Sequence, residues 1–105
     1  MDYNPPMLEV RQSTTFIRWL GKLKDRQAVA RINARILRLS VSGGFGDARA
    51  VREGISEMRI DYGPGYRLYF VRRGAVLVLL LAGGDKSTQE VDIKRAIEVS
   101  KDWKE

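Results

Sequence analysis

Two arginines and a lysine stand at positions where neighbouring strands could bring them to one place. Arg59 and Arg67 lie in alternating polar and apolar segments on either side of the turn signal at 62–65. Lys86 follows the apolar run 75–82 and precedes a predicted helix. Two guanidinium groups and an ammonium around one point suit a phosphodiester, whose negative charge grows as phosphorus becomes pentacovalent. The pattern therefore predicts phosphate chemistry.

Two further residues on the same strands could move protons. Residues two apart on a strand share a face, so Glu57 neighbours Arg59 and Tyr69 neighbours Arg67. Glu57 is the candidate general base. Tyr69 is a weaker candidate acid, because an ordinary phenol has a pKa of about 10. An alternative is structural: Glu57 neutralises the arginines in cross-strand ion pairs.

The apolar spacing predicts a single α+β domain of the order strand–helix–helix, three or four antiparallel strands, and helix. The expected elements are a strand at 8–11, a helix capped by Ser13 or Thr14, a helix capped by Asp25 and stopped by the loop 42–47, strands at 50–53, 55–61, 66–71 and 75–82, and a last helix that starts at the capping-box sequence 87–90. We expect Gly83 and Gly84 to end the last strand.

The helices are expected to pack on one face of the sheet. The other face, with Glu57, Arg59, Arg67 and Tyr69, would then be open to a ligand. An exposed Arg67 side chain could be replaced at a cost below ~0.5 kcal/mol of stability.

Composition excludes several classes of site. The 105 residues contain no cysteine and no histidine, which rules out disulfides, zinc–thiolate sites, cysteine nucleophiles and Ser-His-Asp triads. The acids Glu57, Asp61 and Asp85 are too scattered to predict a metal site. No apolar run approaches the ~20 residues of a membrane helix, so we expect a cytoplasmic protein with no membrane contact.

The net charge of +6 is concentrated in residues 18–38, where seven basic residues accompany one acid, Asp25. An anionic partner is therefore expected, either nucleic acid or an acidic protein segment. The simpler alternative is an ordinary arginine-rich helix surface. The short junction at Lys24-Asp25 predicts that the two helices form an antiparallel hairpin. The candidate RNA-binding residues in this helical hairpin are Lys22, Lys24, Arg26, Arg31, Arg35 and Arg38.

Three strings of residues resemble the HigB-like addiction module killer branch of the RelE/ParE toxin superfamily. They are Glu57-Met58-Arg59-Ile60, the segment GPGYRLYF at 63–70 and the segment LLAGGDKSTQ at 80–89, which Asp92-Ile93 follows. The resemblance runs from about Met7 to Trp103. It leaves residues 1–6 as a flexible leader before a single domain at 7–105, and Met7 as a possible natural start.

The resemblance implies a toxin that cuts messenger RNA on the ribosome, with the ribose 2′-hydroxyl as nucleophile and with no metal or other cofactor. Arg67 matches a strand arginine that contacts the scissile phosphate, and Arg59 and Lys86 fall near further basic residues. The tyrosine or histidine that RelE-type toxins often carry near the chain end has no counterpart at 89–92.

The implied partners are a helix-turn-helix antitoxin, the ribosome and messenger RNA. Two alternatives stay open: a ParE-like inhibitor of DNA gyrase that catalyses nothing, and a small nucleic-acid-binding module without toxicity.

Overall fold

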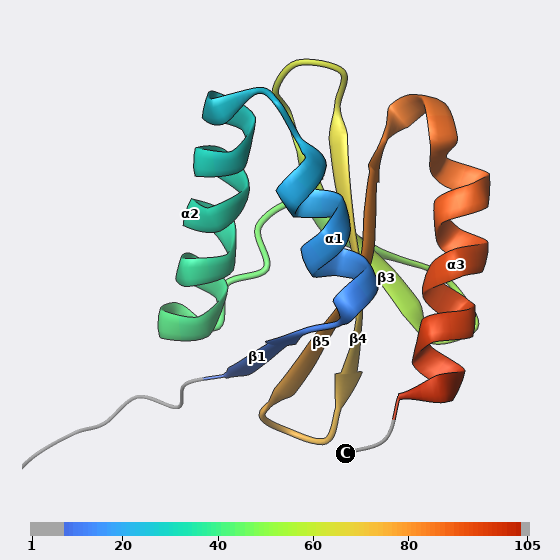
Figure 1. Ribbon diagram of the computed structural model, residues 1–105. Helices are drawn as coiled ribbons and strands as arrows, with labels where there is room; N and C mark the ends of the chain where they lie inside the picture. Colours follow the sequence, from blue (N-terminus) through green and yellow to red (C-terminus); the bar gives the residue numbers. More distant parts are fainter. Residues whose placement is uncertain (1–7, 104–105) are drawn as a thin grey trace, which may run out of the picture.

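The computed structural model describes residues 8–103 and contains a five-stranded sheet between helices (Figure 1). The elements are β1 (Glu9–Gln12), α1 (Thr14–Lys22), α2 (Arg26–Ser42), β2 (Ala48–Arg52), β3 (Ile55–Ile60), β4 (Tyr66–Arg73), β5 (Leu77–Asp85), a 3₁₀ turn (Lys86–Thr88) and α3 (Gln89–Asp102). The α+β class and the element order are those predicted. None of the helices in this part of the chain is long and apolar enough to cross a membrane.

The strand order is β1-β5-β4-β3-β2, with β1 parallel to β5 and every other pair antiparallel. The strand β5 is flanked on both sides and is buried from Leu77 to Gly84, as its apolar sequence predicts. It runs on to Asp85, so the prediction that the glycine pair ends the strand is wrong.

The two glycines of β5 instead make room for large groups. A methyl group on Gly83 would overlap the ring of Trp19 from α1. A methyl group on Gly84 would overlap the Asp92 carboxylate from α3. Successive strand residues point to opposite faces, so each glycine admits a side chain from a different helix layer.

The helix starts show two predicted caps and one that differs. Ser13 accepts a hydrogen bond from the amide of Phe16 at 3.0 Å, and Asp25 caps α2 through the amide of Gln27 at 3.0 Å. The predicted capping box at 87–90 is not formed. The Asp85 carboxylate instead accepts from the amide of Ser87 at 2.8 Å.

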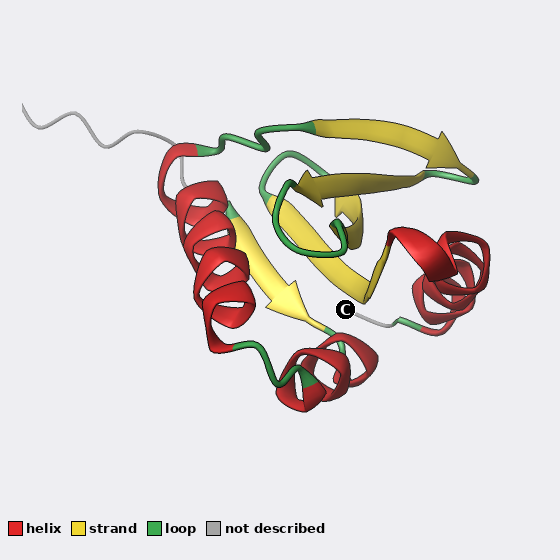
Figure 2. Cartoon of the chain, turned by 90° about the horizontal axis from the view of Figure 1, so that it is seen from above, coloured by secondary structure: helices red, strands yellow, loops and turns green. Residues whose placement is uncertain are grey.

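The helices lie on both faces of the sheet, so the prediction that they share one face is wrong for α3 (Figure 2). The helices α1 and α2 pack on the face of Leu68 and Leu80. The helix α3 packs on the opposite face, where Ile93 meets Tyr69 and Leu79. The physical reason is that β4 and β5 are apolar on both faces, and both faces must be covered.

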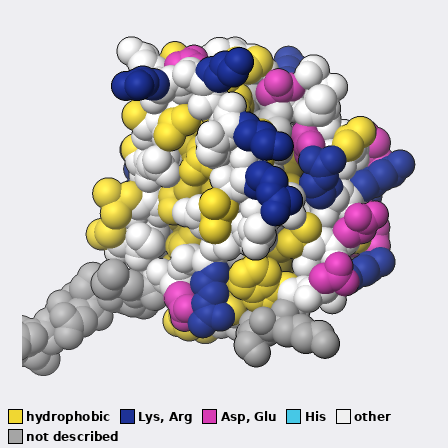
Figure 3. Space-filling view, viewed as in Figure 1, with side chains coloured by type: hydrophobic (Ala, Val, Ile, Leu, Met, Phe, Trp, Pro, Cys, Tyr) yellow, Lys and Arg dark blue, Asp and Glu magenta, His cyan; other side chains and the backbone are white. Residues whose placement is uncertain are grey.

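The surface over α1 and its surroundings is rich in lysine and arginine (Figure 3). Four basic residues here are exposed: Arg18 and Lys22 of α1, Lys24 of the connection to α2, and Arg26 at the start of α2. The predicted local excess of positive charge is therefore a surface feature.

Candidate active site

A cleft of about 400 Å³ lies beside the turn between β3 and β4. Its lining consists of Asp47, Arg59, Asp61, Gly63, Pro64, Gly65, Arg67 and Lys86. The three basic residues that the sequence singled out thus come together in one cleft. Two of them, Arg59 and Arg67, are direct cross-strand partners in the antiparallel pair of β3 and β4. Like charges placed opposite each other destabilise a sheet, so this pair requires negative charge nearby, from the protein or from a ligand.

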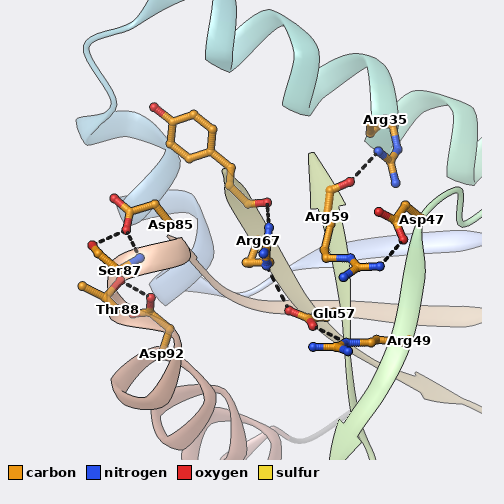
Figure 4. A network of polar contacts seen from close by, with 11 residues as sticks. Arg35, Asp47, Arg49, Glu57, Arg59, Arg67, Asp85, Ser87, Thr88 and Asp92 are labelled. Carbon is orange, nitrogen blue, oxygen red and sulfur yellow. Dashed lines mark hydrogen bonds and ion pairs between the residues drawn. The ribbon is translucent and has the colours of Figure 1, made fainter. Parts of the chain in front are cut away.

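Arg59 is held by a carboxylate from the loop before β2. Its Nη2 donates to Oδ1 of Asp47 at 2.7 Å, and this hydrogen bond raises the pKa of Arg59 and lowers that of Asp47 (Figure 4). The buried Nε of Arg59 has no hydrogen-bond partner within residues 8–103. Arg59 is therefore oriented and fully charged, and one of its donors is unused.

Arg67 rests on a buried carboxylate. Its Nε lies 3.3 Å from Oε2 of Glu57, whose Oε1 accepts from Nε of Arg49 at 2.8 Å (Figure 4). The side chains of Glu57 and Arg67 are only 2% and 12% exposed. With its amide oxygen turned toward Arg67, Gln89 of α3 accepts from Nη2 at 3.2 Å and from Nε at 3.1 Å. The Arg67 guanidinium is thus held by Glu57 of β3 and by Gln89 of α3.

The prediction that Glu57 lies on an open face is wrong. Its carboxylate is buried beneath Arg67 and does not line the cleft. The cross-strand ion pair that we left as an alternative is formed with Arg67, whereas Arg59 pairs with Asp47. In this geometry Glu57 orients a guanidinium and does not meet a ligand.

Tyr69 is also buried, so its predicted place on an open face is wrong as well. It is fully enclosed in the core under α3, and its hydroxyl has no hydrogen-bond partner among the described residues. Burial raises its pKa far above the usual phenol value, and the charge of Glu57 raises it further. A phenol in this position cannot give a proton to a ligand in the cleft.

Lys86 completes the cleft at the end of β5. Gly65 sits between the basic residues with φ +81°, and a Cβ there would lie 3.5 Å from Cβ of Lys86 and 3.7 Å from Nη1 of Arg67. Glycine suits this place because the backbone is left-handed. Asp85 already caps the following turn through the amide and hydroxyl of Ser87. The amide of Ser87 is therefore not available to a phosphate, and the ammonium group of Lys86 is the anion-binding group at this end of β5.

The candidate RNA-binding residues of the helical hairpin divide into two groups. Arg35 is structural: Nη1 donates to the carbonyl of Arg59 and Nη2 to that of Phe45, both at 2.9 Å. Burial and the neighbouring Arg38 lower the pKa of Arg35. Arg31 covers the ring of Tyr62 at 4.6 Å. Arg31 is itself exposed, and so are the other four residues, Lys22, Lys24, Arg26 and Arg38.

Sequence reasoning missed the two carboxylates of the cleft as site residues. Asp61 was considered only for metal binding, although it continues the alternation of Glu57 and Arg59 and so belongs with them. Asp47 comes from the glycine-rich connector and gave no signal. Within residues 8–103, no three acidic side chains gather closely enough to hold a metal ion.

Comparison with known proteins finds a relative in sequence and solved structures of similar fold. No family model matches the chain. An uncharacterised protein of Haemophilus influenzae is 54% identical over 89 residues, which are 85% of this chain and 89% of that protein.

The fold is similar to that of a mutant of the Escherichia coli toxin RelE in the free state, with a TM-score of 0.68 and 14% identity over 88% of this chain and 96% of that one. A chain of the RelBE2 toxin–antitoxin complex of Mycobacterium tuberculosis gives a TM-score of 0.51 and 21% identity over 83% and 99%. The chain therefore has the fold of the RelE toxins, and it belongs to the family of the Haemophilus influenzae protein.

Proposed function

We propose that this protein is the toxin of a type II toxin–antitoxin module, of the HigB-like branch, and that it cleaves messenger RNA on the ribosome in the cytoplasm. The observation that supports this most strongly is the convergence of Arg59, Arg67 and Lys86 on one cleft. Three cations with only two carboxylates among them suit a polyanionic substrate. The RelE toxin fold makes cleavage of RNA the function to test first.

In the proposed reaction, the scissile phosphodiester lies in the cleft. The ribose 2′-oxygen attacks phosphorus and the bond from phosphorus to the 5′-oxygen breaks, which leaves a 2′,3′-cyclic phosphate and a 5′-hydroxyl. Arg67 bonds two phosphoryl oxygens with its planar guanidinium, and Arg59 and Lys86 balance the charge that grows on them. Glu57 acts as a positioning residue because it holds Arg67 from below.

Proton transfer needs groups that reach the cleft. Asp61 is exposed and makes no ion pair within the described chain, so its carboxylate is the proposed acceptor for the 2′-hydroxyl proton. Asp47 is the poorer base, because Arg59 lowers its pKa. The ammonium of Lys86 is the proposed donor to the departing 5′-oxygen.

The test is to induce the chain in bacteria, follow growth and map message 5′ ends by primer extension. Growth arrest with new 5′ ends on translated messages supports the proposal. Arg67→Ala should abolish both, whereas Lys101→Ala on an exposed helix position should change neither. Growth arrest without new 5′ ends would favour the ParE-like inhibition of gyrase. An absence of arrest would favour a non-toxic nucleic-acid-binding module.

The proposed partner is a helix-turn-helix antitoxin that covers the basic surface. Affinity capture of the tagged chain from its own host should recover a small DNA-binding protein in stoichiometric amount. Recovery of the chain alone would count against a toxin–antitoxin module.

A further inference from the structure

A second cationic hollow lies between α1 and α3, outside the cleft. Its volume is about 260 Å³, and its lining is Thr15, Arg18, Trp19, Lys22 and Arg95. We propose that this hollow, the α1–α3 groove, is a second phosphate-binding site that holds the backbone of the same RNA strand. The inference rests on the proposed RNA cleavage and adds a subsite to it.

The cations of the α1–α3 groove lack partners. Arg18 and Lys22 are exposed and stand four residues apart on α1, and Arg95 reaches the groove from α3. None of the three makes an ion pair or a hydrogen bond to another side chain within residues 8–103. Like charges at this helical spacing repel each other, which indicates that an anion neutralises them when the protein works.

No carboxylate lines the α1–α3 groove, whereas the cleft contains two. Arg95 does act on Asp92: burial raises the pKa of Asp92, and Arg95 opposes that rise. The Asp92 carboxylate is buried, however, and it accepts the Thr88 hydroxyl at 2.6 Å. The groove therefore presents unneutralised positive charge to its ligand.

A pair of aromatic side chains joins the groove to the cleft. The indole of Trp19 is half-buried against Gly83 and packs edge-on against Tyr66, with ring centroids 6.2 Å apart. Tyr66 pairs with Asp85, and Asp85 directly precedes Lys86 of the cleft. Figure 3 shows the lysine and arginine side chains gathered over α1 and toward α3. An RNA strand that leaves the cleft beside Lys86 therefore reaches the cations of the α1–α3 groove after it passes Trp19 and Tyr66.

The chemistry of the groove favours a nucleic acid over a protein segment. Protein interfaces are anchored by apolar and aromatic side chains in a dry centre. Apart from the half-buried Trp19, the lining of the groove is polar or charged, and none of the five exposed large aliphatic residues of the described chain belongs to it. A polynucleotide carries one charge per nucleotide and can occupy both cation clusters at once, with the Trp19 ring beside a base or ribose.

The experiment measures binding of a fluorescein-labelled single-stranded RNA with 2′-O-methyl groups, which block cleavage, over a series of salt concentrations. The test variant is Arg18→Gln with Arg95→Gln. The matched control is Lys94→Gln with Lys101→Gln, which removes the same charge from exposed α3 positions outside both sites. Thermal melting confirms that both variants fold.

The slope of log affinity against log salt should become shallower by about 1.4 in the test variant, because two phosphate contacts at ~0.7 each are lost. The control should keep the wild-type slope. Equal slopes in the two variants, or no binding of RNA by the wild-type chain, would overturn the second site. Binding of oligoglutamate is measured in parallel. A test variant that loses binding to oligoglutamate but keeps the wild-type slope for RNA would also overturn the proposal, and it would assign the groove to an acidic protein partner. Growth arrest and message ends test the cleavage proposal separately.

Discussion

Replacing Arg67 tests whether its charge serves a substrate or only the fold. Arg67→Ala removes one of the two ion-pair partners of the buried Glu57 and leaves Arg49, which is 2.8 Å from Oε1. Complete loss of partners for a buried charge costs 3–5 kcal/mol, and loss of one charged hydrogen bond costs roughly 1.5–3 kcal/mol. Since Arg49 remains, we expect a loss of about 2 kcal/mol. This cost is larger than the value below ~0.5 kcal/mol that the sequence predicted for an exposed Arg67.

For a domain of this size, 1 kcal/mol corresponds to roughly 4–8 °C in melting temperature. The Arg67→Ala protein should therefore melt roughly 10 °C lower and still be folded in cells. Its cleavage rate should fall by about 10²–10³, the usual loss when one transition-state donor is removed. Arg67→Lys should recover only part of this rate, because an ammonium cannot bond two oxygens in one plane.

A double variant separates the two effects. Adding Glu57→Gln to Arg67→Ala removes the buried charge and keeps an amide of similar shape beside Arg49. Melting by circular dichroism should then show that stability returns in part, while primer extension shows no return of cleavage. Return of growth arrest together with stability would refute the reasoning. It would mean that Arg67 serves only to neutralise Glu57.

Three further outcomes follow from the structure. Gly83→Ala and Gly84→Ala should each lower the free energy of unfolding by about 1–3 kcal/mol, since the added methyl group would overlap Trp19 or Asp92. Gly21→Ala, which adds a methyl group in open space on α1, should raise it by up to about 1 kcal/mol, and denaturant titration compares the three variants. Burial raises the pKa of Asp92, so the stability of the wild-type protein should fall as pH rises from about 4 through that raised pKa, and Asp92→Asn should show no such fall. Thermal melts at several pH values would contradict this if the difference in melting temperature between the two proteins stayed constant. Cleavage should survive excess EDTA, and activity restored only by added Mg²⁺ would contradict a metal-free reaction.

Local patterns in the sequence predicted most of the fold. Ser13 and Asp25 cap the helices as expected, and strand alternation placed Leu68 toward the paired helices. The placement of α3 could not be predicted in the same way, because a helix start does not say which face the helix covers. The apolar character of both faces of the segment 75–82 carried that information, since each face needs a cover.

For the candidate site, residue type and spacing identified the three cations of the cleft but not the burial of their neighbours. Glu57 and Tyr69 alternate with the core positions and so resemble exposed residues, yet α3 covers Tyr69 and Arg67 lies over Glu57. Asp47 reaches Arg59 from a loop whose path the sequence does not specify. Contacts of this kind depend on tertiary packing, which periodicity does not encode.

The strand order has a consequence for how the protein is made. The strand β5, which pairs with both β1 and β4, is the last strand to be synthesised, and β1 pairs with it in parallel although most of the chain separates the two in sequence. Until β5 emerges from the ribosome, α1 and β1 have no sheet to join, and Lys86 is absent from the cleft. Such long-range pairing makes folding slow and late. A nascent chain therefore lacks the assembled cleft until translation has passed β5, and under the proposed function this delay gives an antitoxin made at the same place time to bind the chain as it folds.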